Sequence, residues 1–252
     1  FEVVGDYYKS AQFLGHALML NEKERHINSL AMILINLGKV NASMGKLDDA
    51  LANYEEVLRY REDIDKKFEA QALSNLARLF SLQGKYPQAL SHYKKALVIS
   101  REIEDRYTEA RLLNDIGILY GMMRNDEKSL ANHGAALEIR QALKDKSGIA
   151  ESYNHIGWWH YRQKDNEKAI SIARLALENG LESQAQEQIF RSYELLSQAY
   201  KELHDYKNSL QHKELSLAIQ EFIENEKHER QLLETQNRYL LGKKETEIEK
   251  LH

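Results

Sequence analysis

A small residue recurs along this chain at almost constant spacing, and this recurrence constrains the fold more than any other feature. The intervals are 39, 40, 40 and 40 residues, between Gly38, Ala77, Gly117, Gly157 and Ser197. A second set of small residues lies twelve positions after these, at Ala50, Ala89, Ser129, Ala169 and Ser209. Leucine follows eight positions later, at Leu58, Leu97, Leu137, Leu177 and Leu217. Five copies that agree in three columns indicate an internal repeat of about 40 residues.

Each copy is predicted to be a pair of helices. In the first half of a copy the apolar residues lie three and four positions apart, as in Leu113, Ile116 and Tyr120, which places them on one helical face. A Gly, Ala or Ser at the middle of that face lets the partner helix approach closely. One helical hairpin cannot bury both of its faces, so neighbouring hairpins must stack. The sequence therefore predicts an all-α solenoid of helical hairpins.

Polar turn residues set the expected boundaries of the copies. Gly, Asn and Asp are typical of helix ends, because Gly and Asn tolerate the left-handed conformation and Asp caps the next helix. We expect turns within the copies at Gly45–Lys46, Gly84–Tyr86, Asn125–Asp126, Asp165–Asn166 and Asp205–Tyr206. We expect breaks between copies at Asp65–Lys66, Asp105–Arg106, Asp145–Gly148 and Asn179–Gly180. The predicted array, 1–221, consists of a partial repeat, 1–25, and five repeats, 27–65, 66–105, 106–145, 146–182 and 183–221.

These segments resemble the tetratricopeptide repeat (TPR) family from residue 5 to about 221. LNDIGILY (Leu113–Tyr120) and YNHIGWWH (Tyr153–His160) are similar to the first helix of that repeat, and KYPQALSHYKKALVI (Lys85–Ile99) to the second. The resemblance implies a right-handed α-solenoid. The repeat is longer than the usual 34 residues and lacks the family's proline at the end of the second helix. Such long repeats resemble those of bacterial sensor and regulatory proteins, and kinesin-light-chain-like and polarity-scaffold arrays share them.

The resemblance also implies where a ligand binds. First helices line the concave face of a TPR superhelix, and the positions that contact a peptide or protein correspond here to Gln71, Ser74, Arg78, Arg111, Asn114, Asn154, Trp158, Tyr161, Arg162, Arg191, Glu194, Gln198 and Lys201. Asn side chains can hold a peptide backbone and Arg side chains can pair with carboxylates. Trp158 and Tyr161 would supply an aromatic anchor, with Trp159 as the core residue of the Trp pair. The alternative is an ordinary solvated face.

The last segment, 222–252, is expected to be a charged helical linker. Acidic and basic residues balance from Asn225 onward, so it does not resemble a polybasic lipid-binding segment. Leu241 and Ile248 lie seven residues apart and Leu251 follows, which is a minimal coiled-coil seam. We therefore expect a homodimer through 225–252. A frayed helix end is the alternative.

Several function classes find no support in the sequence. There is no cysteine, hence no disulfide or thiolate zinc site. His155 and His160 are five residues apart, which places them on different sides of a helix. No phosphate-binding glycine loop and no G-x-S-x-G nucleophile motif occurs. We therefore expect no metal, no cofactor and no catalytic residue, so this segment is not expected to be an enzyme.

Charge and hydropathy restrict the partners. The formal net charge of −4 gives no electrostatic footprint for nucleic acid. No run of 18 apolar residues is present, so no membrane contact is expected. The expected partner is therefore a protein or a peptide.

The expected role is the sensory or regulatory region of a larger bacterial signalling protein. The chain starts at Phe1 and stops within a helical pattern at His252, which is typical of a piece of a longer protein. A peptide or protein segment would bind in the groove, and the C-terminal helix would relay binding to an output domain such as a kinase or cyclase. The alternative is a passive scaffold or adaptor without signalling. The expected location is the cytoplasm, or the periplasm if the parent is a membrane sensor.

Overall fold

The computed structural model describes the backbone of residues 26–249 and the side chains of residues 26–229, 231–233 and 235. The expected partial repeat, 1–25, and the coiled-coil residue Leu251 lie outside this part of the chain. Within residues 26–249 there are ten helices and no strand. The predicted all-α solenoid of helical hairpins is confirmed.

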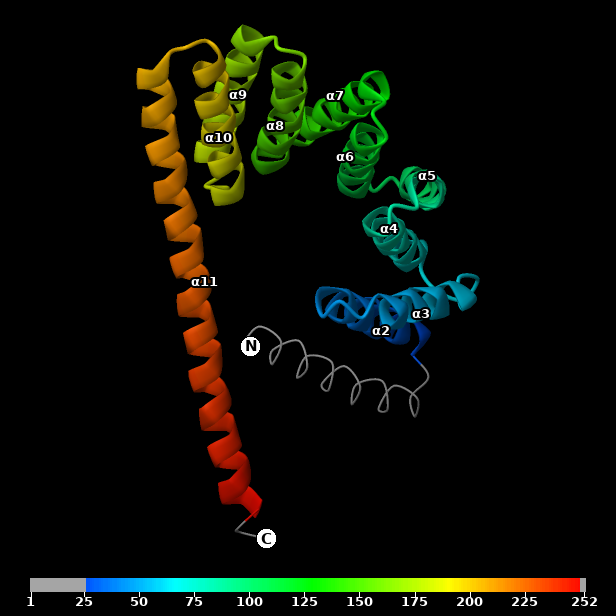
Figure 1. Cartoon of the computed structure of the whole chain (residues 1–252). Helices are drawn as coiled ribbons and strands as arrows, with labels where there is room; N and C mark the ends of the chain where they lie inside the picture. The colour runs from blue at the N-terminus through cyan, green and yellow to red at the C-terminus, as the bar shows by residue number, and fades with distance from the viewer. Residues whose placement is uncertain (1–25, 250–252) are drawn as a thin grey trace. The chain divides into compact units, whose positions relative to one another are not determined.

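The helices alternate between the first and second member of a hairpin (Figure 1). The first helices are α2 (Ile27–Ser43), α4 (Lys66–Leu82), α6 (Arg106–Met122), α8 (Lys146–Arg162) and α10 (Gln186–Glu202). The second helices are α3 (Leu47–Arg59), α5 (Tyr86–Glu102), α7 (Asp126–Leu143), α9 (Asn166–Glu182) and α11 (Tyr206–Glu249). Five hairpins result, and α11 is the only one of these ten helices that extends far beyond its partner (Figure 1).

Helices α4 to α11 follow one another with a period of 20 residues. Their first residues are 66, 86, 106, 126, 146, 166, 186 and 206. In the turn that follows each of α4 to α10, one residue has a positive φ angle: Gly84, Glu104, Arg124, Lys144, Lys164, Gln184 and His204. The next residue often closes the turn with a hydrogen bond to the carbonyl five positions back, as from Asp165 N to His160 O at 3.0 Å.

The prediction that Gly and Asn end these helices is therefore wrong for most turns. Six of the left-handed positions carry residues other than Gly, and Asn125 instead caps α7 by accepting a hydrogen bond from Lys128 N. A left-handed conformation costs an L-residue roughly 1–2 kcal/mol. The turn persists because packing of the two flanking helices and the backbone hydrogen bonds over-determine it.

The expected break at Asn179–Gly180 is also wrong, because both residues lie inside α9. Gly180 is buried and faces α10: a Cβ atom there would lie 3.2 Å from Cγ1 of Ile189. The glycine therefore permits a close approach of two helices and does not form a turn. The turn itself follows at Gln184.

The small-residue columns lie where paired helices cross. In the α2–α3 pair a Cβ on Gly38 would lie 2.5 Å from Cε1 of Tyr54, and in the α6–α7 pair a Cβ on Gly117 would lie 2.7 Å from Cε1 of His133. Ser129 of α7 donates its hydroxyl to the carbonyl of Gly117 at 2.8 Å. The predicted role of these columns in close helix packing is confirmed.

The chain divides into two compact units, one ending at Leu143 and one beginning at Lys144. The regular repeat spacing did not predict this division. The first unit contains α2 to α7, and its largest buried cluster combines side chains of α4 to α7, such as Leu73, Ala96 and Leu113. The second unit contains α8 to α11, where Ala169 and Ala173 of α9 pack with Leu195 and Leu196 of α10.

A pair of glycine substitutions tests the crossing geometry. We expect Gly117→Ala to lower the free energy of unfolding by about 1–2 kcal/mol, because overpacking against His133 outweighs the gain in helix propensity. Gly134→Ala in α7 is the matched control, since no atom lies within 4 Å of the added Cβ. It should stabilise the chain by roughly 0.5–1 kcal/mol. Equal effects of the two substitutions in urea unfolding would contradict the packing assignment.

Candidate functional site

A hollow of about 240 Å³ opens between the first helices α2 and α4 of the first unit. We call it the α2–α4 hollow. It is lined by Lys39, Ala42, Ser43, Tyr54, Asn75, Arg78, Leu79 and Leu82. Tyr54 reaches it from α3, so side chains of three helices contribute to it.

Two cations, Lys39 and Arg78, line this hollow together with Tyr54. Burial raises the pKa of Tyr54 to about 12, and the nearby positive charge of Arg78 opposes this shift. Arg78 and Lys39 are exposed, and neither forms an ion pair with any residue whose side chain is described. The predicted groove residue Arg78 thus lies at a concave feature with positive charge and a phenol at its base.

The sequence reasoning missed Lys39, although the repeat could have revealed it. Lys39 occupies the same column as Arg78, Ile118, Trp158 and Gln198, one position after the small residue of each first helix. Extending the column to α2 identifies Lys39 directly.

The other predicted residues of the first unit differ in their accessibility. Gln71 is exposed. Ser74 is buried and its hydroxyl accepts a hydrogen bond from Nη1 of Arg111 at 3.3 Å, which links α4 to α6. Arg111 also lies 3.6 Å from the carboxylate of Asp115. The structure therefore brings Ser74 and Arg111 together, with the guanidinium already partnered.

Asn114 and Asn154 are 2% exposed and use their amide groups within the fold. Oδ1 of Asn114 is 2.7 Å from Nδ1 of His133. Asn154 donates to the carbonyl of Gln188 at 3.0 Å and accepts from the hydroxyl of Ser192 at 2.9 Å. In this conformation both amides hold neighbouring helices together and offer no surface to a peptide.

In the second unit, Trp158 and Tyr161 form an aromatic pair on α8. Their ring centroids are 5.3 Å apart in an edge-to-face arrangement. Both rings are half-buried and pack against the cluster around Ala169 and Leu195. The expectation that Trp159 is the core member of the Trp pair is wrong, because both tryptophans are half-buried and Trp158 contacts the core. Burial and the nearby Glu202 carboxylate raise the pKa of Tyr161.

The remaining predicted residues of this unit lie on α8 and α10. Arg162 and Lys201 are exposed and Gln198 is half-buried. Arg191 forms an ion pair with Glu187 one turn earlier, at 2.9 Å. Glu194 accepts hydrogen bonds from Lys213 at 2.6 Å and Ser216 at 2.5 Å; burial favours its protonated form, but these bonds outweigh burial and lower its pKa.

His160 fills a core position, in the same repeat column as Phe80, Tyr120 and Tyr200. Its side chain is buried, its Nδ1 lies 3.2 Å from Oδ2 of Asp165, and burial is the main cause that lowers its pKa. Among the described residues, no group of three or more His, Asp or Glu side chains is placed to hold a metal ion. None of the described helices is long and apolar enough to cross a membrane.

The repeat columns and the helical hairpins agree with matches to known families. Models of the tetratricopeptide repeat match residues 30–64, 68–142 and 108–181. The chain belongs to the tetratricopeptide repeat family. The TPR fold is typically non-catalytic and serves protein interactions. No curated protein sequence is a significant match to this TPR chain.

Solved structures share the TPR fold at low sequence identity. BtubC (BKLC) from P. vanneervenii is 19% identical with a TM-score of 0.70, over 88% of this chain and 91% of that protein. Aspartyl phosphate phosphatase F from Bacillus subtilis is 13% identical with a TM-score of 0.70, over 82% of this chain and 55% of that protein. A Rap protein complexed with competence and sporulation factor is 17% identical with a TM-score of 0.65, over 84% and 65%.

Removal of the Asn154 amide should lower the stability of the fold, because this amide bonds within the fold and not to a ligand. We expect Asn154→Ala to lower the free energy of unfolding by about 1–3 kcal/mol, because the buried Ser192 hydroxyl and Gln188 backbone lose a partner. Asn132→Ala is the control, since that amide bonds only to its own helix at an exposed position; it should change stability by roughly 0.5 kcal/mol or less. Urea unfolding of both variants measures the difference, and equal values would contradict the structural role.

Proposed function

We propose that this TPR array binds an acidic peptide segment of a partner protein on its first-helix face. The α2–α4 hollow carries the proposal: Lys39 and Arg78 line it together with the buried Tyr54 and have no ion-pair partner among the described side chains. A peptide carboxylate would meet two cations here, and Arg78 can bind it through two parallel hydrogen bonds. The apolar side chains of Leu79 and Leu82 would contact an adjoining aliphatic group.

The second unit offers a different kind of contact to the same class of ligand. Trp158 and Tyr161 present half-buried aromatic rings, and aromatic residues dominate the binding energy of many interfaces. Exposed Arg162 and Lys201 add positive charge on α8 and α10. We assign these four residues to peptide contact, with Gln71 as an exposed polar position in the first unit.

A regulatory role is the second part of the proposal. Helix α11 runs without a break from Tyr206 to Glu249, 44 residues, and its first part packs against α10 as the second helix of the last hairpin (Figure 1). Lys213 and Ser216 of α11 bond to Glu194 of α10, so a ligand that shifts α10 would also move α11. The structural neighbour complexed with competence and sporulation factor is a precedent for ligand binding by this fold.

A passive scaffold is the alternative function. In that case partners would bind without any change in α11, and the long helix would serve as a spacer. Peptide binding at the first-helix face and its effect on the oligomeric state of the chain distinguish the two.

Charge reversal at the hollow tests the binding site. Peptides selected from a random display library on the whole chain should be rich in Asp and Glu. Arg78→Glu should weaken their binding roughly 10- to 150-fold, because a charge-assisted hydrogen bond contributes roughly 1.5–3 kcal/mol. Lys94→Glu on α5 is the control: Lys94 is equally exposed and does not line the α2–α4 hollow. Calorimetric titration that gives the same affinity for both variants would reject the site.

Light scattering tests whether α11 couples two chains. Phe222, Leu232 and Leu233 of α11 are 46%, 51% and 58% exposed, so an apolar surface continues along the helix. We expect the whole 29.3 kDa chain to form a dimer and a chain ending at residue 221 to be a monomer. Adding a selected peptide should shift the monomer–dimer equilibrium of the whole chain. Monomers in both cases would leave the scaffold as the better description.

A further inference from the structure

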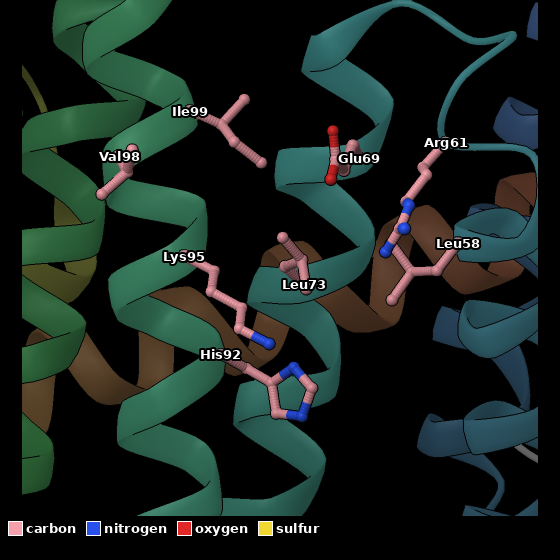
Figure 2. Close-up of a pocket in the computed structure, with 8 residues that line it drawn as sticks. All are labelled: Leu58, Arg61, Glu69, Leu73, His92, Lys95, Val98 and Ile99. Carbon is pink, nitrogen blue, oxygen red and sulfur yellow. The ribbon is translucent and has the colours of Figure 1, made fainter.

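A second hollow of the first unit lies between the second helices α3 and α5 and over α4 (Figure 2). We call it the α3–α5 hollow. Its volume of about 350 Å³ lies within the range of small-ligand sites, roughly 300–1,000 Å³. Leu58, Leu73 and Ile99 supply its apolar base. None of its lining residues belongs to the α2–α4 hollow.

Positive charges border this apolar base from α5 and from the turn that follows α3. In Figure 2, the Lys95 and Arg61 side chains approach Leu73 from opposite sides. Lys95 forms no hydrogen bond or ion pair among the described residues. Arg61 contacts only the adjacent Glu62, at 3.2 Å, with the two side chains 62% and 85% exposed. Such an exposed pair contributes little to stability, so both cations are available to a ligand.

Where the next hairpin begins, a glutamate at the equivalent position is paired with two arginines. Glu109 of α6 occupies the position of Glu69 in α4, 40 residues later. Its carboxylate is bound by Arg101 at 2.8 Å and Arg106 at 2.5 Å, and only 5% of the side chain is exposed. Glu69 has only Lys66 within reach, at 4.0 Å, and is 16% exposed. Arg61, which aligns with Arg101, therefore does not pair with Glu69 and pairs instead with the exposed Glu62.

The lysine of the hollow is specific to this copy. Lys95 aligns with Glu56, Ala135, Leu175 and Leu215 in the other copies. Lys95 is thus not part of the repeated packing scheme, which depends on the small and apolar columns. Its presence at one copy only points to recognition of a ligand.

One ring nitrogen of His92 has no hydrogen-bond partner among the described residues. The His92 ring stacks on Phe80 with centroids 5.3 Å apart and its Nδ1 atom is buried, as is the Nδ1 atom of the equivalent His212, which stacks on Tyr200. Buried polar atoms in folded proteins almost always have a partner. Burial and the neighbouring Lys95 ammonium lower the pKa of His92. An acidic ligand group at this end of the hollow would supply the absent partner and reverse that shift.

We propose that the α3–α5 hollow is a second docking point, which takes an aliphatic side chain flanked by acidic residues from a partner protein. The aliphatic group would pack on Leu58, Leu73 and Ile99. The flanking carboxylates would pair with Lys95 and Arg61 and lie within reach of His92. A partner could then contact two separate hollows of the first unit, since no residue lines both of them.

Methyl NMR of the whole 252-residue chain tests this docking point. The probe is a capped pentapeptide, Glu-Glu-Leu-Glu-Glu, and the comparison peptides replace its Leu with Ser or its Glu residues with Lys. We expect shifts of the Leu58, Leu73 and Ile99 methyl signals with the probe, a rise in the pKa of His92, and binding about fivefold weaker or worse for both comparison peptides. Equal binding of the Lys peptide, or shifts confined to the Leu79 and Leu82 methyl groups of the other hollow, would overturn the proposal.

Adjacent lysines provide a matched pair of variants. Lys95→Glu should abolish the probe-induced shifts, whereas Lys94→Glu should leave them unchanged, because Lys94 is exposed and does not line the α3–α5 hollow. The circular dichroism and Tm of both variants verify folding, and Lys95→Ala serves as a milder change if Lys95→Glu unfolds. Arg78→Glu should not affect these shifts, which separates this site from the first-helix face. Identical losses in the Lys94 and Lys95 variants would reject a specific site.

Discussion

Close crossing of the two helices within a hairpin is the constraint on which the rest of the structure depends. At Gly117 a side chain is absent so that the His133 ring can occupy its place, and at Gly38 the Tyr54 ring does the same. A pair packed this tightly buries only one face of each helix. The remaining apolar faces must find the next hairpin, as Leu73 of α4 and Leu113 of α6 do in a shared cluster. The hollows then lie where helices of successive hairpins diverge and polar side chains replace apolar ones.

The architecture could be predicted because it depends on residue columns, whereas the turns could not be assigned so easily. Gly117, Ala169 and their equivalents repeat because close packing admits only small residues there. The left-handed turn positions carry Glu104, Lys164 or His204, because the flanking helices impose the conformation on whichever residue is present. Gly180 misled the prediction for the reverse reason: its lack of a side chain serves a helix contact with Ile189, and local sequence does not distinguish that use from a turn.

The exposure of candidate site residues was predicted correctly where the repeat column alone determines it. It was not where hydrogen bonds to another repeat determine it. Arg78 is exposed beside a hollow, as its column implied. Asn154 lies only four positions before Trp158, yet it turns into the fold because the Gln188 carbonyl and the Ser192 hydroxyl lie opposite it. On a helical face that contacts both a neighbouring helix and solvent, a polar residue can either bond to the neighbouring helix or face solvent. For Asn154, hydrogen-bond partners 34 and 38 residues away determine that it bonds to the neighbouring helix.

The 20-residue spacing of helix starts has a consequence for which helices pair as hairpins. The turn within a hairpin at Lys164 and the turn between hairpins at Gln184 have the same length, and each has a left-handed residue at the same position. The backbone of these two turns therefore does not distinguish two helices of one hairpin from two helices of neighbouring hairpins. The side chains at the helix crossings make that distinction. A deletion of one 20-residue unit downstream of α4 would preserve such turns yet exchange the roles of first and second helices after it, which places a binding surface out of phase with its neighbours.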